Sequence, residues 1–195
     1  EGNAGWSAAD VLPYFRRAET NLDHVDQYHG ATGPLRVARA RYGVPVVDAF
    51  VESGAAAGLP LTDDFNGAGQ EGAQRYQFTI SEGTRNSTAR AYLRPARGRD
   101  NLTLLDRAMV RELIVEGAVV KGVRYFRGGI EHHAYARETI LSGGAINSPQ
   151  LLMLSGIGAA ADLKGHGIEV VHDLPGVGRN LQDHISAQMN YETRP

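Results

Sequence analysis

The sequence of 195 residues contains no cysteine and very little lysine. The absence of cysteine excludes disulfide bonds, thiolate catalysis and zinc sites built on cysteine. Lysine occurs only at Lys121 and Lys164, and arginine supplies the remaining positive charge. We attribute this bias to genomic base composition. The sequence has no apolar run of membrane-spanning length and no stretch typical of a signal peptide.

The composition is that of an ordinary soluble globular protein. Hydrophobic residues make up 42% and charged residues 22%, and the length permits one or two domains with a real core. The net charge is −2 and the sequence pI is about 6.4, so the charge does not favour a nucleic-acid partner. We expect a soluble, cytoplasmic protein whose oligomeric state the composition leaves open.

The two ends of the sequence predict an excerpt from a longer protein. The chain begins at Glu1 rather than at a methionine, and it stops at Pro195, just after a new β-type run begins.

Residues 138–158 form the most informative stretch, ETILSGGAINSPQLLMLSGIG. Residues 139–142 are a short apolar run that favours a buried strand. Gly143 and Gly144 then permit a tight turn, because neither has a Cβ atom. Asn147 or Ser148 can cap a helix with Pro149 at its first position, where a missing N–H costs nothing. The pattern predicts a strand, a glycine turn and a helix.

The remaining patterns predict a mixed α/β fold. Helices are expected over residues 6–20, capped by Ser7, over 45–58, and before Pro95. Residues 73–80 alternate as a half-buried strand with Tyr76, Phe78 and Ile80 on one face. Further short pieces are a helix over 159–167 and a strand over 169–172. Successive β-type runs separated by glycines predict an antiparallel meander over 102–105, 109–115, 119–126 and 130–137.

Two glycine patterns resemble nucleotide-binding loops but have different contexts. Residues 156–161 fit GxGxxA by letter, yet a helix precedes them where the fingerprint requires a strand, so we interpret them as a helix end and a turn. Residues 176–181 fail the same test. Ser142, Gly143 and Gly144 are better candidates, because small residues at a strand end let the backbone touch a ribose or pyrophosphate. The alternative is that these glycines only permit close packing of helix and strand.

The seven histidines do not form a recognisable metal or catalytic motif. His132 and His133 are adjacent, so in a strand they point to opposite faces. His184 follows Asp183 directly, and sequence neighbours seldom face each other for relay chemistry, so we expect a structural role in a loop. The polar cluster of Arg85, Asn86 and Ser87 is expected to cap a helix, with a position near a cofactor as the alternative.

Several motifs together resemble the glucose–methanol–choline (GMC) family of flavoprotein oxidoreductases. Residues 144–158 resemble the second signature of that family, and PGVGRNLQDH over 175–184 resembles another of its hallmarks. Further matches follow in the family's order over nearly the whole chain: GWS at 5–7, LPYFRRAE at 12–19, GTRNSTARAYL at 83–93 and NLTLL at 101–105.

The resemblance implies FAD as the cofactor and a division of the chain into regions. Residues 1–98 would belong to a partial substrate-side domain with an antiparallel sheet. Residues 99–174 would belong to a Rossmann-like FAD-binding domain with a β-meander, and 175–195 would return to the substrate side. The family also implies that the backbone of Val110 contacts the adenine of FAD, which adds Val110 to Ser142, Gly143 and Gly144 as candidate cofactor-binding residues.

The implied reaction is oxidation of a small-molecule alcohol by hydride transfer to the flavin, as in a choline dehydrogenase-like or alcohol dehydrogenase-like enzyme. We assign no catalytic residue, because the histidine that acts as the catalytic base in the family is expected near the C-terminus of the full protein, beyond this chain. We assign no metal site, because the histidines form no metal-binding motif. The chain alone is expected to bind FAD weakly or not at all and to be inactive. The alternatives are a flavin-containing lyase and a non-catalytic binding module on the same scaffold.

Overall fold

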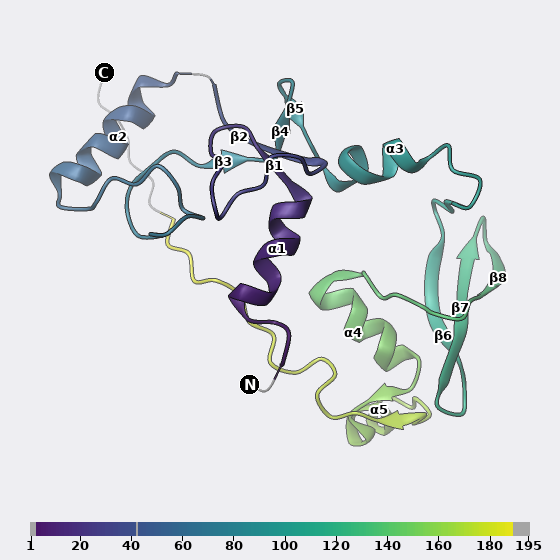
Figure 1. Ribbon diagram of the computed structural model, residues 1–195. Coiled ribbons are helices and arrows are strands. Elements are labelled where there is room, and N and C mark those ends of the chain that lie inside the picture. The colour runs from purple at the N-terminus through teal and green to yellow at the C-terminus, as the bar shows by residue number, and fades with distance from the viewer. Residues whose placement is uncertain (1–2, 42, 189–195) are drawn as a thin grey trace. The chain divides into compact units, whose positions relative to one another are not determined.

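The computed structural model describes residues 3–41 and 43–188 (Figure 1). The chain forms two compact units. The first unit runs from Glu1 to Thr103 and the second from Leu104 to Pro195. Short helices and several small sheets confirm the predicted mixed α/β class. The functional assignment of residues 1–98, 99–174 and 175–195 stays a prediction.

The first unit begins with helix α1, Ala8–Ala18, whose start is fixed by a capping box. The backbone N–H of Asp10 donates to Ser7 Oγ at 3.3 Å, and the backbone N–H of Ser7 donates to Asp10 Oδ2 at 3.1 Å. These two bonds satisfy N–H groups that the helix itself cannot pair. The predicted cap at Ser7 is confirmed.

A small mixed sheet follows α1 directly. Strand β1, Glu19–Asn21, pairs in parallel with β2, Leu35–Arg39, and β2 pairs antiparallel with β3, Gln77–Phe78. Ala38 of β2 is among the few buried apolar residues of the described chain. Because the sheet is short, loops rather than strands build most of this unit.

The predicted strand over residues 73–80 is shorter than expected and is interrupted. Within it, Ala73 forms an isolated bridge with Leu61, and the strands are β3 and β4, Ile80–Ser81; β4 forms a hairpin with β5, Thr84–Arg85. Phe78 is exposed, whereas Gln77 is half-buried because its side-chain amide bonds Asn21 and Asp23. The predicted burial pattern is therefore reversed at Gln77 and Phe78, whereas Ile80 is half-buried and Thr79 is exposed, as the pattern predicts.

The helices of the first unit agree well with the sequence patterns. Helix α2, Pro45–Ala56, begins at the proline as predicted. A π-helical turn, Ala89–Leu93, continues into the short helix α3, Arg94–Ala96. Ser87 Oγ accepts from the backbone N–H of Arg90 at 3.4 Å, in keeping with the predicted cap. Asn86 is buried and its amide donates to the Pro34 carbonyl at 3.3 Å.

The second unit is built on the predicted antiparallel meander. Strands β6, Met109–Glu116, β7, Val119–Arg127, and β8, Ile130–Tyr135, pair in the order β6-β7-β8. Residues 102–105 are not in a strand, contrary to the prediction. Since Val110 pairs with Tyr125 and Glu112 with Arg124, Arg111 is an extra residue that forms a β-bulge in β6.

Helix α4, Gly144–Leu154, packs its C-terminal end against the meander, where the buried residues Ser155 and Leu113 meet. The chain then forms β9, Ile157–Gly158, helix α5, Ala160–Gly165, and β10, His172–Asp173, which pairs in parallel with β9. Gly156 has φ +77° directly after the helix end, which confirms the interpretation of this glycine pattern as a helix end and turn.

Candidate functional site

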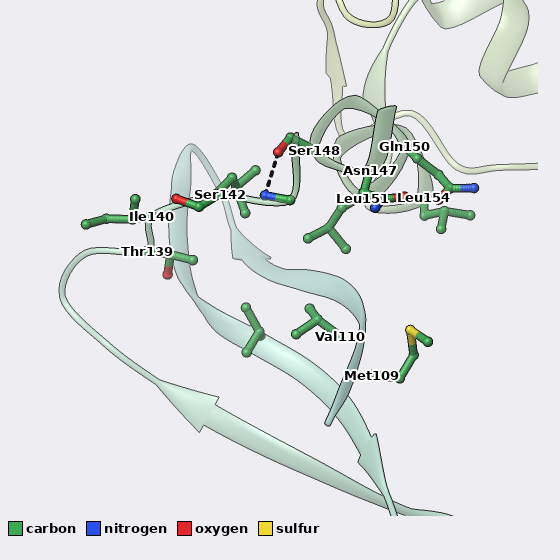
Figure 2. A pocket seen from close by; sticks show the side chains of 13 residues that line it. Met109, Val110, Thr139, Ile140, Ser142, Asn147, Ser148, Gln150, Leu151 and Leu154 are labelled. Carbon is green, nitrogen blue, oxygen red and sulfur yellow. Dashed lines mark hydrogen bonds between the residues drawn. The ribbon is translucent and has the colours of Figure 1, made fainter. Parts of the chain in front are cut away.

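A cleft of about 490 Å³ lies in the second unit between the meander, helix α4 and the segment that joins them (Figure 2). Met109 and Val110 line it from β6, and Val123 lines it from β7. Helix α4 and the connecting residues 139–143 form the other walls, with Asn147, Ser148, Gln150, Leu151 and Leu154 as the helical contributors. Apolar walls with a few polar groups are typical of cofactor pockets.

Three of the four predicted cofactor-binding residues line this cleft. Val110 lies on β6, whereas Ser142 and Gly143 immediately precede α4. The fourth residue, Gly144, is the first residue of the helix. The fold thus brings together residues more than thirty positions apart in sequence.

Val110 occupies an outer strand of the meander next to the bulge at Arg111. An outer strand leaves backbone groups on one side without a strand partner. A bulge redirects the strand locally and is common beside functional sites. The backbone around Val110 is therefore suited to contact a planar group from its edge.

The two glycines suit the turn for different physical reasons. A Cβ atom at Gly143 would lie 3.2 Å from Asn147 Cβ and 3.3 Å from the Ser148 backbone nitrogen, so a side chain here would press tightly on the start of the helix. Gly144 has open space around it but adopts φ +88°, which L-residues rarely adopt. Ser148 Oγ accepts from the Gly143 N–H at 3.0 Å and fixes the turn (Figure 2).

The local structure before α4 differs from the prediction in two ways. Residues 139–142 form no strand, because the chain leaves the meander after the Ala136 N–H donates to the Lys121 carbonyl at 2.9 Å. No described strand pairs with residues 139–142, so the buried strand predicted before the glycine turn is absent among the described residues.

The helix also begins earlier than predicted. Gly143 is the N-cap, with no side-chain cap, and Pro149 lies inside the helix. Ser148 does not act as the N-cap because its hydroxyl reaches back to Gly143. The first-turn N–H groups of α4 therefore have no capping side chain, an arrangement that favours a bound anion.

The first unit holds a second polar cluster, which the sequence analysis missed. His29 is 3% exposed and its two ring nitrogens face two carboxylates. Nδ1 lies 3.0 Å from Glu19 Oε2, and Nε2 lies 2.9 Å from Asp64 Oδ2. Asn21, also buried, places its Nδ2 3.0 Å from the same Nδ1.

These contacts shift the pKa values of two groups in opposite directions. Burial is the largest influence on His29 and opposes its charge, but hydrogen bonds to Asp64 and Glu19 and their negative charges together raise its pKa above 6.5. Burial would likewise raise the pKa of Asp64, yet hydrogen bonds from His29 and the Asn66 N–H, with the His29 charge, lower it. The cluster therefore favours an imidazolium between two carboxylates.

Asp26 completes this cluster without binding the ring. Its Oδ1 accepts from the backbone N–H groups of Tyr28 at 2.8 Å and His29 at 3.0 Å. Since both ring nitrogens of His29 already bond carboxylates, we interpret the group as an ion-pair network. Glu19, His29 and Asp64 come from separate segments, and no spacing rule in the sequence links them.

His132 and His133 follow the predicted geometry. His132 stacks on Tyr125 at 5.3 Å between ring centroids, whereas His133 bonds Glu131 on the opposite face of the strand. His184 donates its backbone N–H to Asp183 Oδ1 at 2.8 Å, and its predicted role in a loop between regions stays a prediction.

The decisive comparison is with protein families. A model of the GMC oxidoreductase family matches residues 1–186, nearly the whole chain. The chain belongs to the GMC oxidoreductase family. This match confirms the resemblance inferred from the sequence motifs. It also confirms that the family consists of flavoprotein oxidoreductases.

Relatives within the GMC family include choline dehydrogenases. The chain is 51% identical to the mitochondrial choline dehydrogenase of Homo sapiens over 197 aligned positions, which cover 100% of this chain and 33% of that protein. It is 46% identical to the oxygen-dependent choline dehydrogenase of Brucella anthropi, with 100% and 36% covered. The chain thus spans about a third of the length of these relatives.

Two solved structures, of an oxidase and of an FAD-dependent oxidoreductase, are similar to this chain in fold. Pyridoxine 4-oxidase from Mesorbium loti aligns with a TM-score of 0.87 and 36% identity, covering 94% of this chain and 36% of that one. An FAD-dependent oxidoreductase from Chaetomium thermophilum aligns with a TM-score of 0.86 and 30% identity, covering 93% and 34%. These alignments support FAD as the cofactor of the fold.

None of the described helices is both long and apolar enough to cross a membrane.

Proposed function

We propose that this chain is part of an FAD-dependent oxidoreductase that oxidises the CH–OH group of a small alcohol. Membership of the GMC family and the choline dehydrogenase relatives support this activity. Bound FAD would accept the hydride, and the protein would supply position and electrostatics. A choline-like alcohol is the proposed substrate, because both of the relatives described above are named choline dehydrogenases.

The cleft beside α4 is the proposed contact with the nucleotide part of FAD. The observation that carries this proposal is that Val110 and the turn at Ser142–Gly143 line one cleft. The donor set fits such a group: bare backbone at Gly143, uncapped N–H groups at the helix start, and apolar walls from Met109 and Leu151. Backbone N–H groups and the positive end of a helix favour phosphate, while apolar walls favour an aromatic base.

Each candidate residue has a definite proposed role. The backbone of Val110 would recognise the edge of the adenine, with little demand on the side chain. Ser142, Gly143 and Gly144 would let the ribose or pyrophosphate approach the backbone closely. We assign no catalytic residue within this chain, and we expect the base to belong to other parts of the full-length protein.

The test uses the full-length protein rather than the 195-residue chain. We expect it to purify with a flavin absorbance spectrum, and choline added without oxygen should bleach that spectrum as the flavin is reduced. A full-length protein without flavin would contradict the proposal. We expect the 195-residue chain alone to bind FAD weakly or not at all, because other parts of the full-length protein are expected to complete the FAD site. One bound FAD per isolated chain would contradict this expectation.

Two alternatives are distinguished by the same material. A lyase on this scaffold would carry flavin but would cleave its substrate without a net change in redox state, which product analysis detects. A non-catalytic binding module would neither reduce flavin nor turn over an alcohol. The expected cytoplasmic location stays a prediction, since the name of the human relative specifies the mitochondrion.

A further inference from the structure

We propose that His29 is a proton-operated clamp that holds the loop of residues 62–67 to the β1–β2 connection. His29 lies in that connection, Glu19 lies on β1, and Asp64 lies in the distant loop. One imidazole therefore joins two segments that are 35 positions apart in sequence. The inference concerns the conformation of the first unit and does not depend on the proposed oxidoreductase activity.

The clamp is built to hold the Asp64 carboxylate in one place. Asp64 Oδ1 accepts the Asn66 N–H at 2.9 Å, and its Oδ2 faces His29. Thr62 Oγ1 exchanges hydrogen bonds with the Asp64 backbone at 3.2 and 3.3 Å. Asp64 thus fixes the shape of its own loop and ties that loop to His29.

Nδ1 of His29 faces two groups that make opposite demands. When Nδ1 carries a proton, it donates to Glu19 Oε2 at 3.0 Å, while the Asn21 amide donates to Glu19 Oε1 at 3.2 Å. When this proton leaves to solvent, Nδ1 can only accept, and its available donor is Asn21 Nδ2 at 3.0 Å. Loss of one proton therefore exchanges Glu19 for Asn21 as the partner of the ring.

The exchange weakens both ion pairs at once. A neutral ring keeps its Nε2–H bond to Asp64 but loses the charge that strengthens it. At Nδ1, the lone pair of the neutral ring then faces the lone pairs of Glu19 Oε2, and the two repel each other. Glu19 Oε2 still accepts a hydrogen bond from the Gly30 N–H at 3.2 Å. The loop is consequently held less tightly when His29 is neutral.

The charged groups around His29 favour the protonated ring overall. The positive neighbours are Arg16, whose Nε donates to the His29 carbonyl at 3.3 Å, and Arg39, which reaches His24 and the Asp63 carbonyl. His24 lies 5.6 Å away between ring centroids. The acidic groups that face the ring or its immediate neighbours are Glu19, Asp23, Asp26 and Asp64. Two carboxylates in direct contact with the ring outweigh the more distant cations.

The test measures amide hydrogen exchange of residues 60–73 in the full-length protein between about pH 5 and about pH 9, corrected for the intrinsic rate. We expect protection of this loop to be lost as pH rises through the titration of His29. His29→Gln removes the titrating group and should abolish this pH-dependent loss. His133→Gln is the matched control, because that exposed histidine also bonds a carboxylate, Glu131, but holds no loop.

Glu19→Gln keeps the test decisive even where His29→Gln does not fold. Removing this negative charge should move the midpoint of the protection loss to lower pH, since the ring then holds its proton less tightly. Unchanged protection across the pH range, or an unchanged midpoint in Glu19→Gln, would overturn the proposal.

Discussion

The side chain of Ser155 joins helix α4 to strand β6 through the backbone of Leu113. The backbone N–H of Leu113 donates to Ser155 Oγ at 2.8 Å, and this hydroxyl donates to the Leu151 carbonyl at 2.6 Å. Ser155 and Leu113 are 8% and 6% exposed, so water does not easily replace either bond. This single hydroxyl fixes the end of the helix that forms one wall of the cleft.

Replacing that hydroxyl leaves a buried donor without a partner. We predict that Ser155→Ala lowers the free energy of unfolding by about 1–3 kcal/mol, the typical cost of an unsatisfied buried group. Denaturant unfolding of the full-length protein measures this loss. Ser53→Ala is the control: Ser53 Oγ donates to the Phe50 carbonyl on an exposed helix, so this variant should change stability little. Equal effects of both variants would contradict the role of Ser155.

A side chain at Gly144 tests the proposed cofactor contact. Because Gly144 has φ +88°, alanine strains the backbone by about 1–2 kcal/mol. The free protein can relax this strain by moving the start of α4. FAD binding must then return the backbone to the strained conformation, and this costs binding free energy. We predict that Gly144→Ala weakens FAD binding by about 5- to 30-fold, measured by titration of the apoprotein with FAD.

Gly128→Ala is the matched control for that experiment. Gly128 also has a positive φ, +61°, and open space around it, but it lies in the turn between β7 and β8 and does not line the cleft. It should lower stability similarly and leave FAD affinity unchanged. If both variants weaken FAD equally, Gly144 acts only through general stability.

A methyl group at Gly67 should dislodge the Asp64 carboxylate from His29. A Cβ atom built there would overlap Asp64 Oδ2, whereas a Cβ at Gly69 would meet nothing. We predict that Gly67→Ala lowers the thermal unfolding temperature most at about pH 5–6, where the ring is protonated, and less as pH rises. Gly69→Ala should have little effect at any pH. A constant loss across pH would indicate a steric effect unrelated to the clamp.

The two shifted pKa values predict a window of maximal stability. The raised pKa of His29 contributes stability below its ordinary value of 6.5, and this contribution is lost as pH rises through the folded pKa. The lowered pKa of Asp64 contributes above its ordinary value of 3.8 and is lost as pH falls. The free energy of unfolding, measured at a series of pH values, should therefore show the greatest stabilisation by His29 and Asp64 between these limits. His29→Gln should flatten the alkaline side of the curve.

Local signals predicted the elements that depend on local chemistry. Ser7 caps α1 through a bond three residues away, and Pro45 starts α2 because its ring suits the first helical position. The meander was predictable because its glycines separate runs with β-favouring side chains. Val110 entered the candidate site only through the family resemblance, since a valine in a strand is ordinary.

Non-local contacts explain what the sequence did not reveal. Residues 139–142 have the composition of a strand, but a strand requires a neighbour, and no described strand lies beside them. The start of α4 was misjudged because Ser148 bonds backwards to Gly143. Glu19, His29 and Asp64 meet only through tertiary structure, and a single buried histidine gives no periodic signal.

The position of FAD in the full-length protein tests the central claim most directly. A crystal structure of that protein with bound FAD should place the nucleotide within hydrogen-bonding distance of the backbone at Val110 and at Ser142–Gly144, inside the cleft beside α4. A structure in which FAD binds elsewhere and this cleft is filled by protein side chains would contradict the account.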